Sequence, residues 1–145
     1  MKRYPDTEKR GTGIGWYSSL LESILIDNDT DYTSINFKLS TDEGHFKCLI
    51  DGFFKPRIKL NDTDALIYHA TDELCCLAFP GIKGKKITTF HHVSNSREGR
   101  SVLLSIIWKI AAKRAVKYSD AIIAVSEQTK KDLVKQFKVN PDKIH

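Results

Sequence analysis

The sequence predicts an α/β domain of the Rossmann-like, three-layer kind, built on a mostly parallel sheet. Two observations predict it. Short apolar or β-branched segments alternate with segments of helical periodicity, and polar or glycine-containing stretches follow the apolar ones. The size agrees, because 145 residues make one domain that can bury a substantial core. Apolar and charged fractions of 41% and 28% are those of a folded globular domain, and they exclude disorder of the whole chain.

Four segments have helical periodicity. Thr71 is expected to cap the second and Ser126 the fourth, because a hydroxyl oxygen can accept from the free backbone N–H groups of a first turn. In the third, apolar residues at i, i+3 and i+4 predict the side that packs on the sheet. The expected ranges are 15–27, 72–78, 101–118 and 127–137, and the expected packing side of the third carries Leu103, Ile106, Ile107 and Ile110.

Strands are predicted between the helices. Residues 120–125 give the clearest one, because they form a short, continuous apolar run, as in strands covered on both faces. Residues 45–52 fit either a strand or an irregular connection. The other expected strands are 32–39, 66–68, 86–90 and a last one that begins at 143–145.

Ligands of open parallel sheets bind beyond the carboxyl ends of the strands, so function is expected there. The glycine-rich stretch 10–15 before the first helix brings backbone N–H groups near a helix N-terminus, where an anion can bind. Trp16 replaces the last glycine of the dinucleotide fingerprint, and no Gly-Lys-Ser/Thr follows as a phosphate-binding loop would need. We favour phosphate contact over a plain tight turn.

Two histidines follow the predicted strand 86–90. Successive residues of a strand point to opposite faces, so we expect His91 to face the ligand crevice and His92 to face away from it, either packed or in solvent. Any effect of removing His92 should then fall mainly on stability. A neutral imidazole can bond to a sugar hydroxyl or act as a base, although a purely structural histidine fits the pattern equally. Arg97 and Arg100 could clamp a phosphate or carboxylate, but a solvated loop is slightly favoured.

The formal charge of +5 fits an anionic ligand or membrane surface and is too small to indicate nucleic acid. Lys109, Lys113 and Lys117 could lie on an anionic membrane, although a solvated helix edge is favoured. No apolar stretch could span a bilayer, and no secretory signal is visible. An odd cysteine count without a C-x-x-C pair predicts a reducing, cytoplasmic protein with no metal site.

Six segments occur in an order that resembles the N-terminal half of a retaining GT-B glycosyltransferase of the group 1 type, family 4. The run from Ser119 to Glu127, with Lys130 to Leu133 after it, is the most specific part of the resemblance. The six segments are 13–17, 66–70, 86–91, 119–127, 130–133 and 139–144.

The resemblance implies an enzyme that transfers a sugar from a nucleotide-sugar donor to a hydroxyl acceptor, without a cofactor or an obligatory metal. Within it, Gly13 and Gly15 match the turn that approaches the donor diphosphate, and His91 matches the histidine that contacts the donor sugar. Ser126 and Glu127 match the cleft side of the domain, which chiefly receives the acceptor.

The sequence departs from the family pattern in two places. Only Met1 to Tyr4 precede Pro5, where the family has a full first strand, and the chain stops at His145, before the nucleotide-sugar domain. We therefore expect residues 1–145 to be one acceptor-side domain that is inactive alone. The alternatives are a non-catalytic Rossmann-like module that binds a phosphorylated ligand or a partner protein, and a domain that binds a membrane surface through its lysines.

Overall fold

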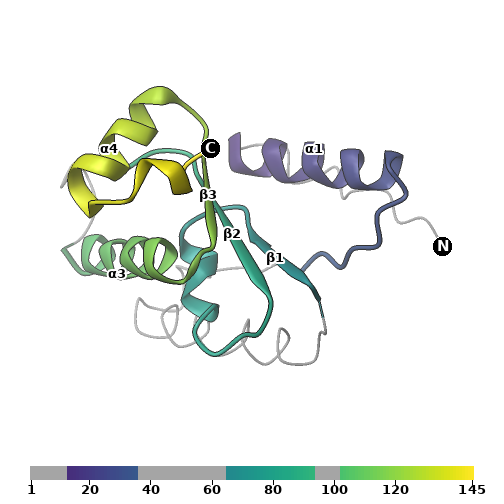
Figure 1. Ribbon diagram of the computed structural model, residues 1–145, viewed down its shortest axis with the longest axis horizontal. Helices are drawn as coiled ribbons and strands as arrows, with labels where there is room; N and C mark the ends of the chain where they lie inside the picture. The colour runs from purple at the N-terminus through teal and green to yellow at the C-terminus, as the bar shows by residue number, and fades with distance from the viewer. Residues whose placement is uncertain (1–12, 36–64, 94–101) are drawn as a thin grey trace. The chain divides into compact units, whose positions relative to one another are not determined.

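A computed structural model describes residues 13–35, 65–93 and 102–145. The chain divides into two compact units, residues 1–35 and 36–145, and each is described by itself. The second unit contains the sheet and most of the described helices, and the first contains a single described helix (Figure 1).

The sheet has three parallel strands in the order β1-β2-β3 (Figure 1). These strands are β1 (Ile67–Ala70), β2 (Lys85–Phe90) and β3 (Ala121–Ala124). They confirm the expected strands at 66–68, 86–90 and 120–125, with ends shifted by one or two residues. The strand start expected at 143–145 is confirmed in part: Ile144 forms a parallel bridge with Ile122, supported by hydrogen bonds from the His145 and Ala124 amides, whereas Lys143 belongs to a 3-10 turn.

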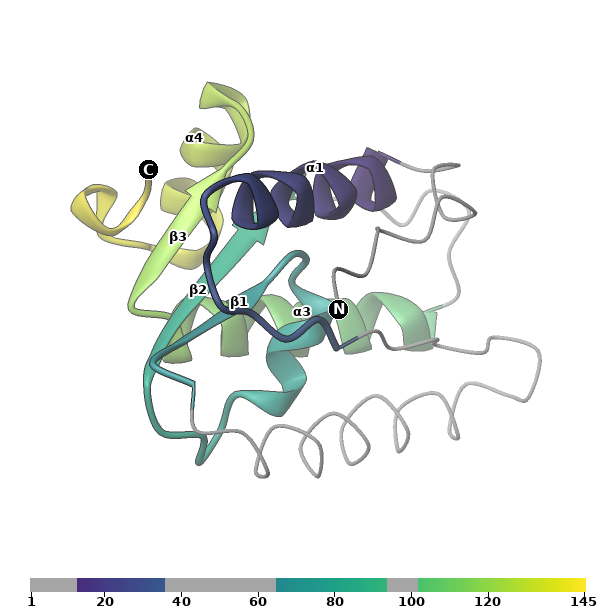
Figure 2. The same ribbon diagram turned by 90° about the vertical axis from the view of Figure 1, so that its right-hand side faces the viewer.

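Helices α3 (Val102–Tyr118) and α4 (Glu127–Phe137), with the short 3-10 helix η2 (Leu74–Ala78), pack on one face of this sheet (Figure 2). A final 3-10 turn, η3, spans Pro141–Lys143. The parallel sheet and its helices confirm the predicted Rossmann-like α/β fold.

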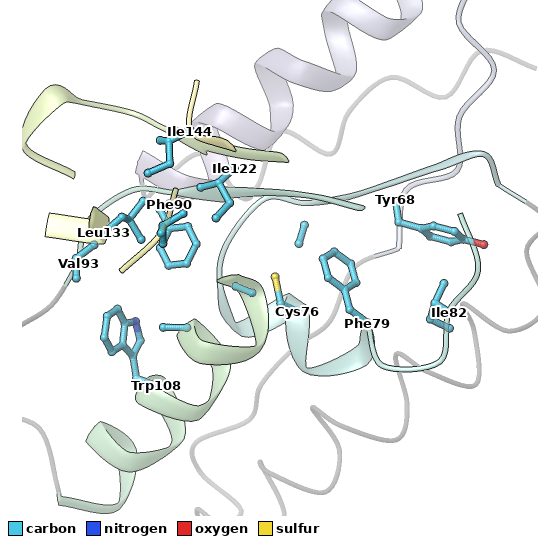
Figure 3. Close-up of a cluster of buried hydrophobic side chains, with 14 residues drawn as sticks. Tyr68, Cys76, Phe79, Ile82, Phe90, Val93, Trp108, Ile122, Leu133 and Ile144 are labelled. Carbon is cyan, nitrogen blue, oxygen red and sulfur yellow. The ribbon is translucent and has the colours of Figure 1, made fainter. Parts of the chain in front are cut away.

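The core lies between the sheet and these helices (Figure 3). Alternate strand residues point into it, as the period of a strand requires. On the helix side, the rings of Trp108 in α3 and Phe137 in α4 lie 6.3 Å apart and tilted by 59°. The core includes the side chains of Tyr68, Phe79, Phe90, Trp108, Ile122 and Leu133.

The packing side of α3 differs from the predicted one. Ile107 is buried as expected, but Ile106 and Ile110 are 49% and 45% exposed, and the side chain of Leu103 lies outside the described part. Small residues let a helix approach a sheet closely, so three alanines, rather than Ile106 and Ile110, turn inward beside Ile107. The buried residues of α3 are Ile107, Trp108, Ala111, Ala112 and Ala115.

The predicted helix 72–78 is shorter and is capped by a different residue. It is the 3-10 helix η2, with Glu73 at its N-cap position, and the side chain that accepts from its first amides is that of Asp72 rather than Thr71. The Asp72 Oδ1 atom accepts from the backbone N–H groups of Leu74 at 2.7 Å and Cys75 at 3.1 Å. A carboxylate oxygen that reaches two amides outcompetes a hydroxyl for this position.

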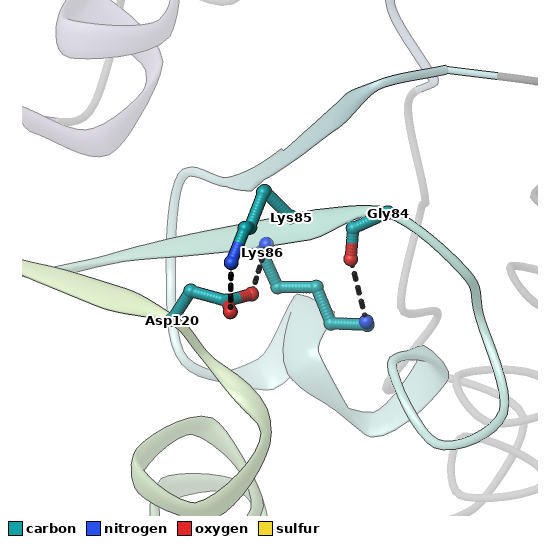
Figure 4. Close-up of polar contacts among 4 residues, drawn as sticks. All are labelled: Gly84, Lys85, Lys86 and Asp120. Atoms are coloured by element: carbon teal, nitrogen blue, oxygen red, sulfur yellow. Dashed lines mark hydrogen bonds and ion pairs between the residues drawn. The ribbon is translucent and has the colours of Figure 1, made fainter.

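The amino end of β3 is tied to β2 by Asp120 (Figure 4). Its Oδ2 atom accepts from the Lys86 backbone N–H at 2.8 Å, its Oδ1 atom pairs with Lys85 Nζ at 3.2 Å, and its own N–H donates to the Lys86 carbonyl at 2.7 Å. The hydrogen bond from the Lys86 backbone N–H holds the pKa of Asp120 below its usual value, and the hydrogen bond from the Lys85 ammonium is the next largest cause. These contacts support the register that pairs Ile87 with Ala121.

In the first unit, α1 spans Gly13–Asp27, which confirms the expected helix and starts it two residues earlier. None of its residues is buried. Residues 32–35 are not in a strand, so that part of the expected strand 32–39 is wrong. Residues 36–39, and the expected segment 45–52, lie outside the described residues.

Candidate functional site at the carboxyl edge of the sheet

The three parallel strands end at the same edge, and their following loops meet there. The amide of Val125, after β3, donates to the carbonyl of Phe90, the last residue of β2, at 3.2 Å. The loops contain residues 71–73, 91–93 and 125–126. This edge is where an open parallel sheet binds its ligand, so it is the candidate site.

His91 joins two of these loops. Its half-buried ring places Nε2 3.0 Å from the carbonyl oxygen of Thr71, and its own carbonyl accepts from Thr129 Oγ1 at 3.4 Å. Since a carbonyl only accepts, Nε2 carries the proton in this contact. The ring is therefore oriented by the fold before any ligand arrives.

His92 is exposed to solvent, which is one of the two positions expected for it. The ring of His91, and not that of His92, bonds to a neighbouring loop, so we expect His91 to make the larger contribution to stability. The chain leaves the strand after Phe90, so strict alternation of faces no longer applies to residues 91 and 92.

Ser126 and Glu127 are exposed at the start of α4. The predicted cap is confirmed, because Ser126 Oγ accepts from the Thr129 backbone N–H at 3.1 Å. The two side-chain hydroxyls of Ser126 and Thr129 also lie 2.9 Å apart. Thr129 thereby connects the cap of α4 to the carbonyl of His91, and Glu127 lies in the first turn, where the helix dipole favours a negative charge.

The site also contains a buried carboxyl that sequence reasoning missed. Glu73 is only 6% exposed and accepts a hydrogen bond from Trp108 Nε1. Burial raises its pKa, while its backbone bond, the indole N–H and the charge of His92 act in the opposite direction. The sequence showed an acid early in a short helix, but a tryptophan 35 positions later gave no sign of being its partner.

A second histidine lies one strand away. His69 in β1 is half-buried, and its Nε2 atom is 2.9 Å from Thr89 Oγ1 in β2. Burial lowers the pKa of His69, which favours the neutral ring. It occupies the sheet face opposite to Tyr68 and Ala70, which are buried in the core.

The glycines lie in the other unit. Gly13 and Gly15 form the first turn of α1, and a Cβ atom at Gly13 would meet nothing within 4 Å. Gly13 has no positive φ, so neither its backbone nor the surrounding chain requires a glycine there. Arg97 and Arg100, predicted for the acceptor side, lie outside the described residues.

Two kinds of feature are absent from the described part of the chain. No group of three or more histidine, cysteine and acidic side chains within it is placed to hold a metal ion. No helix within it is long and apolar enough to cross a membrane.

Comparison with known proteins adds one finding. The model of Glycosyltransferase Family 4 matches residues 47–145. The matched range contains all three strands, η2, α3 and α4, and therefore the whole candidate edge. A search among curated proteins found no match.

Proposed function

The chain belongs to glycosyltransferase family 4, and we propose that it is the acceptor-binding, N-terminal domain of an enzyme that transfers a sugar from a nucleotide-sugar donor to a hydroxyl acceptor with retention. The observation that carries this proposal is the position of the family match, which includes the complete carboxyl edge with His91, Ser126 and Glu127. Ligand binding at that edge is the general behaviour of open parallel sheets.

His91 is proposed to contact the donor sugar. Its Nε2 proton points to the Thr71 carbonyl, which fixes the plane of the ring without help from a ligand. A fixed ring loses little conformational entropy when it bonds to a sugar hydroxyl, and this favours recognition. Ser126 and Glu127 are proposed to line the same cleft, because both are exposed at the end of β3.

Gly13 and Gly15 are proposed to approach the donor diphosphate. The open space around Gly13 supports this, because a glycine that the fold does not need can be explained by a ligand that comes close to the backbone. Arg97 and Arg100 are proposed to bind an anionic group of the acceptor, as guanidinium groups do.

We also propose that this domain transfers no sugar by itself. A leaving diphosphate develops charge that positioned cations must stabilise, and those are proposed to come from a second, donor-binding domain, without an obligatory metal or a cofactor. The proposed location is the cytoplasm, in keeping with Cys75 and Cys76, which are free thiols.

An NMR titration of the isotope-labelled 145-residue chain tests the site. UDP-glucose and GDP-mannose serve as donor probes, and inorganic phosphate is the control ligand. At least one donor should shift the backbone amides of residues 71–72, 91–93 and 125–127 more than phosphate does. The same samples, assayed for transfer to water or to added sugars with and without EDTA, should show no turnover.

The His91→Ala variant distinguishes a nucleotide-sugar site from a non-catalytic module that binds phosphate. It should weaken binding of the donor that shifts those amides, since a lost hydrogen bond costs about 0.5–1.5 kcal/mol. Shifts concentrated at residues 83–86, on the opposite edge of the sheet, would place the ligand elsewhere. Equal affinity for inorganic phosphate and nucleotide sugar, unchanged in His91→Ala, would instead indicate a non-catalytic phosphate-binding module.

A further inference from the structure

Helix α3 has an outward side with an unusual combination of residues. The helix turns by about 100° per residue, and its buried residues, centred on Ala111 and Ala115, occupy one side. Trp108 points from this side into the core (Figure 3). The opposite side, called here the outer face of α3, carries Val102, Ile106, Ile110, Lys109, Lys113 and Lys117.

The apolar half of the outer face is exposed to an extent that is uncommon for such residues. Val102, Ile106 and Ile110 are 78%, 49% and 45% exposed, and they follow one another at intervals of four residues, so they form one stripe. Contiguous apolar side chains on a surface indicate a site of interaction with a membrane or a partner.

The basic half continues the same side of the helix. Lys109, Lys113 and Lys117 are also spaced by four and are exposed. No aspartate or glutamate occurs between residues 102 and 118, so no charge within the helix compensates them. None of the three forms an ion pair with another residue that the structure describes, although Lys117 Nζ lies 5.2 Å from the centre of the Tyr118 ring.

Helix α4 shows what an ordinary solvated helix looks like in the same domain. Its surface mixes Glu127 and Asp132 with Lys131 and Lys135, and its large apolar side chains are at least partly buried. The outer face of α3 has a single sign of charge together with exposed aliphatic side chains. Contact with water alone therefore accounts for the exposed residues of α4, but not for those of the outer face of α3.

We propose that the outer face of α3 binds the surface of an anionic lipid bilayer. The aliphatic stripe would enter the boundary between headgroups and acyl chains, while the lysines would reach the anionic headgroups. From Val102 to Lys117 the helix is about 22 Å long, so several headgroups lie within reach at once. The helix lies along the membrane and does not cross it, in keeping with the absence of a spanning helix from the described residues.

Co-sedimentation of the 145-residue chain with vesicles tests this contact, independently of any sugar transfer. Vesicles of phosphatidylcholine with phosphatidylglycerol should bind the chain, and vesicles of phosphatidylcholine alone should bind it much more weakly. Binding should fall as salt is added, because salt screens the attraction between lysines and headgroups.

Matched variants locate the contact on α3. Lys109→Gln with Lys113→Gln should lower the partition coefficient roughly thirty-fold, since each lysine near an anionic surface contributes about 1 kcal/mol and 1.4 kcal/mol is a factor of ten. Lys131→Gln with Lys135→Gln removes the same charge at the same spacing from α4 and should leave most of the binding.

A second pair tests the aliphatic stripe. Ile106→Ser should weaken binding roughly fivefold by removing apolar surface from the acyl boundary, whereas Ile24→Ser on α1, where the side chain is 48% exposed, should not. Circular dichroism confirms that each variant is folded. Equal losses for the two lysine pairs, or no binding to anionic vesicles, would overturn the proposal. Binding to soluble polyanions but not to vesicles would also overturn it and would indicate an acidic protein or nucleic acid as partner.

Discussion

The imidazole Nε2 atom of His91 lies 3.0 Å from the carbonyl oxygen of Thr71, so a side chain after β2 holds the backbone after β1. The two strands are neighbours in the sheet, and this contact continues their pairing past the last ladder bond. His91 thus has two possible contributions, one to stability and one to ligand binding, and different variants can separate them.

The histidine pair should show opposite behaviour in stability measurements. His91→Ala removes the bond to Thr71 and should lower the free energy of unfolding by about 1 kcal/mol. His92→Ala alters an exposed residue and should change it by less than about 0.5 kcal/mol. Urea denaturation of the two variants measures the difference. A larger loss for His92→Ala would mean that His92 carries the structural contact.

Glu73 should make stability depend on pH. Burial raises its pKa above the ordinary value of 4.5, so the folded chain holds the proton more tightly than the unfolded chain does. Its contribution is then fully present below pH 4.5 and is lost as pH rises through the raised pKa. Glu73→Gln keeps an oxygen for Trp108 but cannot titrate, and should lose less stability over that interval in denaturation series at several pH values.

Trp108→Phe tests whether Glu73 is the source of this pH dependence. The indole N–H lowers the pKa of Glu73, so its removal should raise this pKa further and make the loss of stability with rising pH steeper. Wild type and Glu73→Gln with the same pH profile would show that Glu73 does not titrate differently in the folded chain.

Thr88 and Ser119 should behave as a coupled pair. Thr88 is fully buried, with its Oγ1 atom 2.5 Å from Ser119 Oγ and 2.9 Å from Cys76 Sγ. Thr88→Val leaves the buried serine hydroxyl without this partner and should cost about 1–3 kcal/mol. Adding Ser119→Ala should cost less than the sum of the single changes, because both polar groups are then gone. Additive losses in a thermal unfolding cycle would argue against coupling.

Two glycines should respond differently to alanine. At Gly84, φ is +96° and a Cβ atom would lie 2.9 Å from the Ala65 carbonyl oxygen, so Gly84→Ala should destabilise by about 1 kcal/mol or more. At Gly13, nothing lies within 4 Å of the added atom, and Gly13→Ala should be neutral within about 0.5 kcal/mol. Calorimetry of both variants measures this, and a tolerant Gly84 would contradict the crowded, positive-φ backbone that precedes β2.

The strands and the cap of α4 could be predicted because their signals are local. The apolar run 121–124 and the serine before α4 need only their own neighbours to specify a strand and a helix start. The cap of η2 was predicted at the wrong residue, because Thr71 and Asp72 are both good caps and only the path of the chain decides between them.

The burial of α3 and the contacts of the site could not be predicted, because they depend on distant residues. Ile106 and Ile107 are equally apolar, and only the packed sheet and η2 determine which of them is covered. The contacts of His91 with Thr71 and of Glu73 with Trp108 join positions 20 and 35 apart. A periodic pattern in one segment contains no information about such pairs.

Cys76 gives the domain a built-in reporter of its own opening. Its thiol is fully buried against Thr88, and burial raises its pKa well above the ordinary value. A thiol reagent attacks the thiolate, so the closed domain should react very slowly at neutral pH. The rate at which a thiol reagent labels Cys76 would then measure how often η2 separates from the sheet. Mass spectrometry can follow this labelling in a variant with Cys48 replaced by serine, with fragmentation of the labelled peptide to distinguish Cys76 from Cys75.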